Sequence, residues 1–292
     1  MALTAETVKA GLSQVERTLD GTGLAYTKLD VSGKEVASLE ADVLSPYAHL
    51  RYLMASGNSL EDASALAALP SLLSADLHAN KIAAVPDLGA LAYFQALDLS
   101  ENEVASLEGL NLPKLTYLNV ASNKLESLAG ADKLAAVQRL DVSKNALKSF
   151  EGLGAVPTLS ELVASGNAIE SLAGLEGATG VTSIVADGNA LVSLDGLAAE
   201  ALGKLVSLSL AGNQIADVAE VAKLAALPAL KSLTLADNEV AGGDEYRQEV
   251  LVVLPRLQVL DGERVTVEER REANRVAAER AEEAAAAAAA AA

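Results

Sequence analysis

The chain of 292 residues is acidic: 22 Lys and Arg stand against 40 Asp and Glu, which gives a formal net charge of −18. Because nucleic acids and anionic membrane surfaces are bound mainly through Lys and Arg, neither is an expected partner, and basic proteins fit the charge better. The chain has no cysteine, no Asn-x-Ser/Thr site, no signal-peptide core and no apolar run of about 18 residues, so we expect a soluble intracellular protein without disulfides.

The first segment, residues 2–20, predicts an amphipathic helix. Thr4 could cap its first turn, and apolar residues then recur at helical spacing, at Val8, Leu12, Val15 and Leu19. We assign residues 1–25 to a helical N-terminal cap, because the open end of a repeat array would otherwise expose apolar core to water.

From Tyr26 onward one pattern repeats: apolar-x-x-Leu-x-apolar-x-x-Asn-x-apolar-x-x-apolar. It is clear in FQALDLSENEVASLEGL at 94–110, and a degenerate first copy has Lys34 in place of Asn. The asparagines recur every 21 to 25 residues, at Asn58, Asn80, Asn102, Asn123, Asn145, Asn167, Asn189, Asn213 and Asn238. A period of about 20–29 residues with this pattern is the signature of a leucine-rich-repeat solenoid. We therefore predict an α/β solenoid over residues 26–245, a right-handed superhelix of about ten repeats with a parallel sheet on its concave side.

Within each repeat, a short strand such as ALDLS should point alternate side chains into the core. The asparagine follows the strand, where its carboxamide can both donate to and accept from backbone groups that the turn leaves unpaired. We therefore expect a buried asparagine ladder with a structural role and no part in catalysis. A repeat of about 22 residues has no room for a full helix on the convex side, where tight bends are expected at Gly109, Gly152, Gly174 and Gly196.

Residues 246–283 predict a C-terminal cap. A helix is expected near Tyr246 to Leu254, followed by a half-repeat with Leu257 and Leu260 and by a charged helix from about Thr266. The last residues, 284–292, form an alanine tail of low complexity, which is either a genuine alanine helix or a stretch of unidentified side chains.

The concave face is the candidate site, because its outward side chains remain free for a partner. Its central column is acidic in the first half and apolar in the second, and Tyr, Met and Arg are frequent anchors of interfaces. The alternative is a solvent face that binds nothing. We predict that this face binds a helix or an extended segment carrying basic residues through Tyr52, Met54, Asp76, His78, Asp98, Tyr117, Asn119, Arg139, Asp141, Val163 and Val185.

We expect no catalytic, cofactor or metal site. The sequence has two histidines and no cysteine, Gly-rich phosphate loop or nucleophile motif. The aspartates of the concave face, such as Asp76 and Asp98, could in principle act as paired carboxylates or metal ligands. Because Ser and Ala surround them, we interpret them as a solvated acidic stripe and predict that the protein is not an enzyme.

Two segments are more specific than a generic repeat. In residues 3–53, the first strand carries Tyr26, Lys28 and Leu29, and YAHLRY at 47–52 leads into the second. At the other end, YRQEVLVVLPRLQVLD at 246–261 is followed by EERREA at 268–273. Both segments resemble the leucine-rich-repeat protein of the ciliary radial spoke. The resemblance implies a structural subunit of the axoneme, located in the cytoplasm and the cilium or flagellum, with other radial-spoke proteins as partners.

The C-terminal motif is also similar to leucine-rich repeats of the phosphatase-regulator, spliceosomal and dynein-light-chain types. The alternative function is therefore a regulatory subunit that docks on a protein phosphatase or a dynein motor domain. Direct RNA contact is disfavoured by the net charge of −18.

Overall fold

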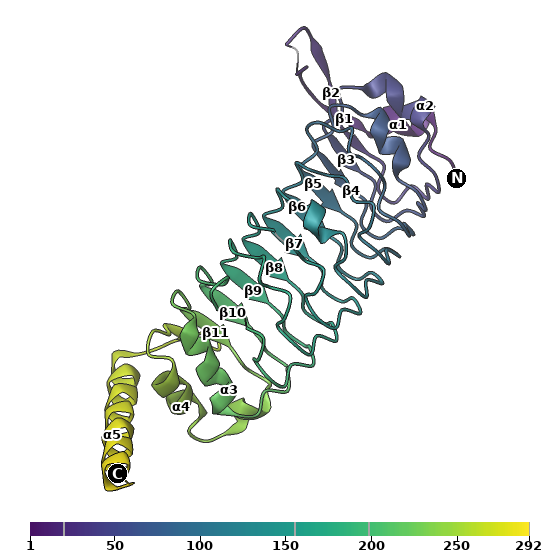
Figure 1. The fold of residues 1–292 in the computed structure, drawn as a ribbon. Helices are drawn as coiled ribbons and strands as arrows, with labels where there is room; N and C mark the ends of the chain where they lie inside the picture. Colours follow the sequence, from purple (N-terminus) through teal and green to yellow (C-terminus); the bar gives the residue numbers. More distant parts are fainter. Residues whose placement is uncertain (20, 155, 198, 292) are drawn as a thin grey trace.

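The computed structural model describes residues 1–19, 21–154, 156–197 and 199–291, and these form one elongated solenoid (Figure 1). The strands of the described chain lie in a single sheet in sequence order. Pairing is parallel from β2 to β12, whereas β1 and β13 pair antiparallel at the two ends. The strands are β1 (Leu12–Arg17), β2 (Leu24–Asp30), β3 (Tyr52–Met54), β4 (Ser74–Asp76), β5 (Ala96–Asp98), β6 (Tyr117–Asn119), β7 (Arg139–Asp141), β8 (Glu161–Val163), β9 (Ser183–Val185), β10 (Ser207–Ser209), β11 (Ser232–Thr234), β12 (Val259–Leu260) and β13 (Glu263–Arg264).

Helices are concentrated at the two ends of the solenoid (Figure 1). Among the described residues between β4 and β10, the only helical segment is one short 3₁₀ turn, because repeats of this length leave no room for more. The α-helices are α1 (Ala5–Gly11), α2 (Ala41–Leu44), α3 (Val218–Ala222), α4 (Tyr246–Val253) and α5 (Val267–Ala291). The 3₁₀ turns are η1 (Ser45–Tyr47), η2 (Ser64–Ala68), η3 (Ala131–Lys133), η4 (Lys223–Ala226) and η5 (Glu239–Gly242).

The core is a continuous stack of aliphatic side chains. The middle residue of each short strand points inward, and Leu97, Leu118 and Leu140 are fully buried. Each such leucine stabilises the fold by roughly 1.5–3 kcal/mol relative to exposure to water. The predicted solenoid with its long parallel sheet is therefore confirmed.

The asparagine ladder is present as predicted. The Asn102 side chain donates from Nδ2 to the carbonyls of Leu77 (3.0 Å) and Leu99 (3.0 Å), and its Oδ1 accepts the backbone N–H of Ile82 at 2.9 Å. Asn80 bonds to the equivalent groups one repeat earlier. Each amide thus joins two successive turns and leaves no polar group of its own without a partner.

Left-handed glycines form the bends on the side opposite the sheet. The four that the sequence predicts have φ values of 93°, 89°, 98° and 79° at Gly109, Gly152, Gly174 and Gly196. At Gly174 the turn of the preceding repeat lies so close that a Cβ atom would stand 2.3 Å from the carbonyl carbon of Phe150. This position therefore requires glycine for its backbone angle and for the space around it.

The single helix predicted over residues 2–20 is wrong. Thr4 caps α1 as expected, accepting the N–H of Thr7 at 3.2 Å, but the helix ends at Gly11. The chain then forms β1, which pairs antiparallel with β2 and covers the edge of the sheet. The pairing with β2 takes the place of the helix that the apolar spacing predicted. Val8 of that spacing is buried in the structure, whereas Val15 and Leu19 are exposed. The last residue of the predicted helix, Asp20, lies outside the described residues.

The hairpin β1–β2 projects from the N-terminal end of the solenoid (Figure 1). Arg51, just before β3, attaches the hairpin to the repeat beside it. Its Nη1 atom lies 2.6 Å from the carboxylate of Glu16, and its Nη2 atom donates to the carbonyl of Arg17 at 2.5 Å. The N-terminal cap is thus one helix and a hairpin.

The C-terminal cap follows the sequence prediction closely. The predicted helix is α4, the half-repeat contributes β12, and the charged helix is α5. Thr266 and Glu269 form a reciprocal capping box at the start of α5, with N···O distances of 2.7 and 3.2 Å. Arg270 fixes α5 to α4 by donating to the carbonyls of Leu251 (2.8 Å) and Leu257 (2.7 Å).

The alanine tail continues α5 as far as Ala291, and residue 292 lies outside the described residues. The boundaries proposed for the cap, the repeats, the second cap and the tail stay a prediction.

Candidate protein-binding surface

The outward side chains of β2 to β12 form one surface, which we call the sheet face. Strand register aligns them in columns, so that Asp76 lies beside Asp98 and Tyr117 lies beside Arg139. The central column reads Asp30, Met54, Asp76, Asp98, Asn119, Asp141, Val163, Val185, Ser209 and Thr234. Ten of the eleven candidate residues stand on strands of this face, and His78 follows two residues after Asp76, so the structure places them on one surface.

The acidic residues of the central column have a structural role that the sequence did not reveal. Each carboxylate accepts the backbone N–H two residues later: Asp76 from His78 (3.0 Å), Asp98 from Ser100 (2.8 Å) and Asp141 from Ser143 (3.0 Å). One oxygen therefore holds the turn at the end of the strand. The charge remains at the surface, because these aspartates are only half-buried.

Asp98 is at the centre of a hydrogen-bond chain across three repeats. Its Oδ2 atom accepts from the amide of Asn119 at 3.0 Å, and its Oδ1 atom accepts the hydroxyl of Ser100. The Ser100 hydroxyl also lies 2.9 Å from Nδ1 of His78, whose Nε2 is 4.0 Å from the carboxylate of Glu101. These contacts hold the side chains in fixed positions, which lowers the entropy that a partner would lose in binding them.

Tyr117 and Arg139 form a cation–π contact on the sheet face. The Arg139 guanidinium lies 5.9 Å from the centre of the Tyr117 ring and 3.4 Å from the carboxylate of Glu161. Burial, and then the nearby carboxylate of Asp98, raise the pKa of the Tyr117 phenol above its ordinary value. Tyr117 therefore stays neutral at physiological pH, and its hydroxyl can donate to a partner.

The C-terminal half of the sheet face is less polar. Val163 and Val185 are half-buried in the central column, and the flanking column beside them changes from Glu161 to Ser183 and Ser207. The carboxylate of Asp187 is held by the Ser209 hydroxyl at 2.6 Å and by the N–H of Ala211 at 2.8 Å. Small side chains here would allow the backbone of a bound segment to approach closely.

An apolar surface on the N-terminal hairpin was missed by the sequence analysis. Val15 and Tyr26 are opposite each other in the antiparallel pair and about half-exposed, and Leu24 is 72% exposed. Tyr26 shares its side of the strand with Lys28, which pairs with Tyr52, so this surface continues the sheet face. The sequence Gly-Thr-Gly at 21–23 between two apolar segments was the signal that could have indicated the hairpin.

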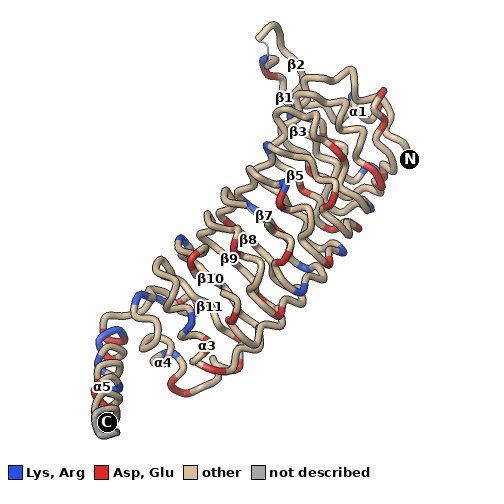
Figure 2. The backbone as a smooth tube through the Cα atoms, viewed as in Figure 1, with Lys and Arg blue, Asp and Glu red and all other residues tan. Residues whose placement is uncertain are grey.

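The acidic residues are not confined to the sheet face. Figure 2 shows Asp and Glu along the whole length of the solenoid. Among the described residues, no group of three His, Asp or Glu side chains lies close enough together to hold a metal ion. The binding role of the eleven candidate residues stays a prediction.

Within the part of the chain that the structure describes, no helix combines the length and the apolar character needed to cross a membrane.

Comparison with known proteins agrees with the repeat pattern. A family model described as leucine-rich repeat matches residues 138–290. Leucine-rich repeat-containing protein 23 of Bos taurus is 34% identical over 274 residues, which cover 94% of this chain and 79% of the bovine protein. The Homo sapiens protein of the same name is 34% identical over 272 residues, covering 93% of this chain and 78% of its own length.

Solved structures share the architecture. An internalin from Listeria monocytogenes aligns with a TM-score of 0.68 and 25% identity, covering 88% of this chain and 80% of the internalin. The leucine-rich-repeat domain of APL1 aligns with a TM-score of 0.56 and 23% identity over 73% of this chain and 55% of that domain, which shows the fold alone. The repeat pattern, the matched family model and relatives at 34% identity over nearly the whole chain show that it belongs to the leucine-rich-repeat family and is a homologue of leucine-rich repeat-containing protein 23.

Proposed function

We propose that this chain is a non-enzymatic scaffold subunit of the axonemal radial spoke in motile cilia and flagella, and that it binds other axonemal proteins through the sheet face. The observation that carries the proposal is the resemblance of residues 3–53 to the radial-spoke leucine-rich-repeat protein. In the structure these residues form α1, the hairpin and β3, where Tyr26 and Tyr52 are exposed. The segment that resembles the spoke protein thus also contributes exposed apolar and aromatic side chains to the sheet face and its hairpin.

The bound partner would be a helix or an extended segment with basic residues. The carboxylates of Asp76, Asp98 and Asp141 lie in one column, which would attract such a segment and fix its register. Tyr52, Met54 and Tyr117 provide the apolar and aromatic contacts on neighbouring strands. Because hydrogen bonds hold the three carboxylates in place, little ordering of these groups is needed when a partner binds.

The location is tested by cross-linking in demembranated motile cilia. Lys28, Lys81, Lys124 and Lys144 are distributed along the first half of the solenoid and would report its neighbours by mass spectrometry. We expect cross-links from these lysines to radial-spoke proteins. Absence of the chain from cilia, with recovery beside a phosphatase or in nuclear particles, would contradict the proposal and favour the regulatory alternative.

The binding face is tested by removing its charge while keeping an acceptor for the backbone N–H of each turn. The triple variant Asp76→Asn, Asp98→Asn, Asp141→Asn keeps an oxygen acceptor for each backbone N–H but loses three negative charges. We expect its recovery in the axonemal fraction to fall by about tenfold or more, as for loss of interface charges. The matched control carries the same charge change away from the sheet, at the exposed residues Glu108→Gln, Asp132→Asn and Glu151→Gln. Equal recovery of both variants would show that the sheet face does not bind the partner.

A further inference from the structure

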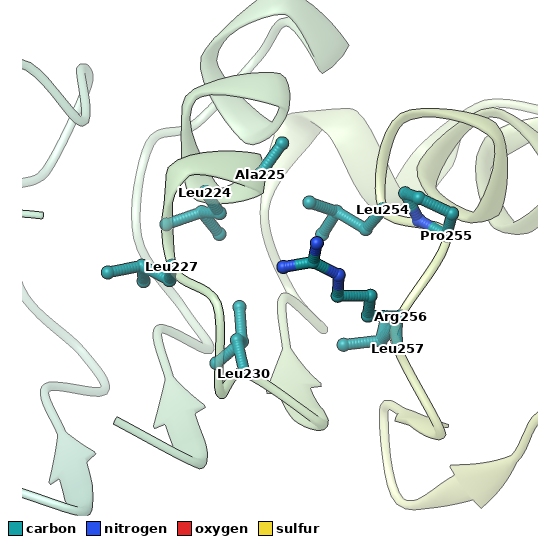
Figure 3. Close-up of a pocket in the computed structure, with 8 residues that line it drawn as sticks. All are labelled: Leu224, Ala225, Leu227, Leu230, Leu254, Pro255, Arg256 and Leu257. Atoms are coloured by element: carbon teal, nitrogen blue, oxygen red, sulfur yellow. The ribbon is translucent and has the colours of Figure 1, made fainter. Parts of the chain in front are cut away.

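An apolar notch opens between the last two repeats, away from the sheet face (Figure 3). Its walls are Leu227, Leu230, Leu254 and Leu257, with Ala225 of η4 and Arg256 beside them. The four leucines belong to two turns with the same sequence pattern, Leu-Pro-x-Leu, at 227–230 and 254–257. These turns are 27 residues apart (254 minus 227), against 22 between Asn145 and Asn167 in a regular repeat, and α4 lies between them.

The size of the notch limits what it can hold. Its volume is about 130 Å³. Cofactor and drug pockets have volumes of about 300–1,000 Å³, so the notch is too small for them. An apolar cavity of about 150 Å³ accommodates benzene. The notch therefore fits one large apolar side chain, such as Leu, Met or Phe.

The charge beside the notch is positive, in a chain with a net charge of −18. Arg256 is exposed, and its guanidinium makes no hydrogen bond or ion pair with any residue that the structure describes. In Figure 3 this guanidinium points across the opening toward η4. Lys231, next to Leu230 of the wall, is also exposed, and its ammonium group has no partner among the described residues.

Two other cations of this region, Lys223 and Arg247, are paired. Lys223 lies 2.6 Å from Asp195 and 2.7 Å from Glu220, and Arg247 lies 2.6 Å from Glu269. The contrast leaves Arg256 and Lys231 available for carboxylates from outside the chain. An anionic group beside an apolar side chain would match both properties of the notch.

We propose that the apolar notch is a docking site for a segment of another protein, which inserts one large apolar side chain and places an adjacent Asp or Glu on Arg256. The partner is acidic and apolar at this point, opposite in charge to the basic segment proposed for the sheet face. The two surfaces are separate, so one chain could hold both partners at the same time. The inference does not depend on the radial-spoke assignment.

The test is a selection of displayed random 12-residue peptides on the full chain. We expect the selected peptides to share Leu, Met or Phe next to Asp or Glu. Synthetic copies should bind at least tenfold more weakly to Ala225→Phe, in which the new ring closes the notch. The matched control is Ala226→Phe, at an exposed position of the same turn that does not line the notch, and it should bind as the unmodified protein does.

A charge reversal gives a second readout. In a selection on Arg256→Glu, the preference beside the apolar residue should change from Asp or Glu to Lys or Arg. Circular dichroism of each variant establishes that it is folded before binding is measured.

Three outcomes would overturn the proposal. One is a selection without enriched peptides or without the apolar–acidic pair. Another is binding that Ala225→Phe and Arg256→Glu leave unchanged. The third is a concentration-dependent dimer in sedimentation that Ala225→Phe abolishes, since a second copy of the chain would then be the occupant.

Discussion

Arg139 lies over Tyr117, with its guanidinium carbon 5.9 Å from the ring centre, and the same side chain contacts Glu161 at 3.4 Å. One cation thus joins β6, β7 and β8 in the middle of the sheet face. Because the cation and Glu161 are both partly exposed to solvent, these contacts contribute little to folding, about 1 kcal/mol or less.

We therefore expect Arg139→Ala to reduce binding more than stability. Its recovery in the axonemal fraction should fall by about tenfold, as for an interface anchor, while the midpoint of urea unfolding changes little. Lys133→Ala, at an exposed position away from the sheet, is the control for loss of one positive charge. A loss of recovery in both variants would indicate a general charge effect instead of an anchor.

Two substitutions of Asp98 distinguish the hydrogen-bonding role of the acidic column from its charge. Asp98→Asn loses the acceptor for the Asn119 amide but keeps one for the N–H of Ser100, and should lower the free energy of unfolding by about 0.5 kcal/mol. Asp98→Ala removes that acceptor and should destabilise the protein by about 1 kcal/mol. Urea unfolding followed by circular dichroism measures both, and equal stability of the two variants would show that the turn does not need the carboxylate.

The asparagine ladder should be the most sensitive polar feature of the core. Asn102→Ala leaves the N–H of Ile82 and the carbonyls of Leu77 and Leu99 without their amide partner inside the solenoid. We expect a loss of about 3 kcal/mol or more in the free energy of unfolding. Asn111→Ala, at an exposed position outside the ladder, should change it by less than about 0.5 kcal/mol. Similar losses in both variants would contradict a special role of the ladder.

Two glycines distinguish backbone strain from steric clash. Gly109 and Gly174 have similar left-handed φ values of 93° and 98°, but of the two only Gly174 would bring an added methyl group within 4 Å of backbone atoms, the nearest at 2.3 Å. Gly109→Ala should therefore cost about 1–2 kcal/mol, from the backbone angle alone. Gly174→Ala should cost clearly more, because the Phe150 turn must move. Equal unfolding midpoints would mean that the neighbouring turn adapts freely.

Glu269 should make the C-terminal cap sensitive to acid. The Arg247 guanidinium, followed by the N–H of Thr266, lowers the pKa of this carboxyl to about 2 from an ordinary value of 4.5. Since the pKa in the folded state is lower than in the unfolded state, the ionised carboxylate stabilises the fold above about pH 4.5. That contribution, about 1 kcal/mol for a pair partly open to solvent, is lost as the pH falls toward 2.

Glu269→Gln removes the charge and keeps a side chain suited to the capping box. The difference in unfolding free energy between the unmodified protein and this variant should shrink as the pH is lowered from 7 to 3. Glu268→Gln, at an exposed position one residue earlier in α5, is the control for loss of one negative charge. A difference for Glu269→Gln that stays constant with pH would contradict the assignment.

The repeat architecture was predictable because its signal is redundant. Nine asparagines at regular spacing each indicate the same turn. A repeat that departs from the pattern can therefore be assigned from its neighbours. The register of the central column followed directly, since adding one period moves a residue to the next strand. The glycine bends and α4 were predicted for similar local reasons.

What the sequence did not predict depends on contacts between separate segments. The pattern Val8, Leu12, Val15 and Leu19 fits a helix, but the pairing of β1 with β2 overrides it after Gly11. The hydrogen bond from Asn119 to Asp98 depends on strands that are neighbours only in the folded chain. The apolar notch likewise arises where an irregular repeat spacing meets α4.

The reversed strands at the two ends give the solenoid a defined length. A second copy could not continue the parallel repeat directly, because the strands at the two ends, β1 and β13, run opposite to those between them. Each internal repeat adds about 4.8 Å, the spacing between neighbouring strands. Gain or loss of one internal repeat would therefore change the distance between the ends by one such step without altering either end, which makes this fold a molecular spacer adjustable in fixed increments.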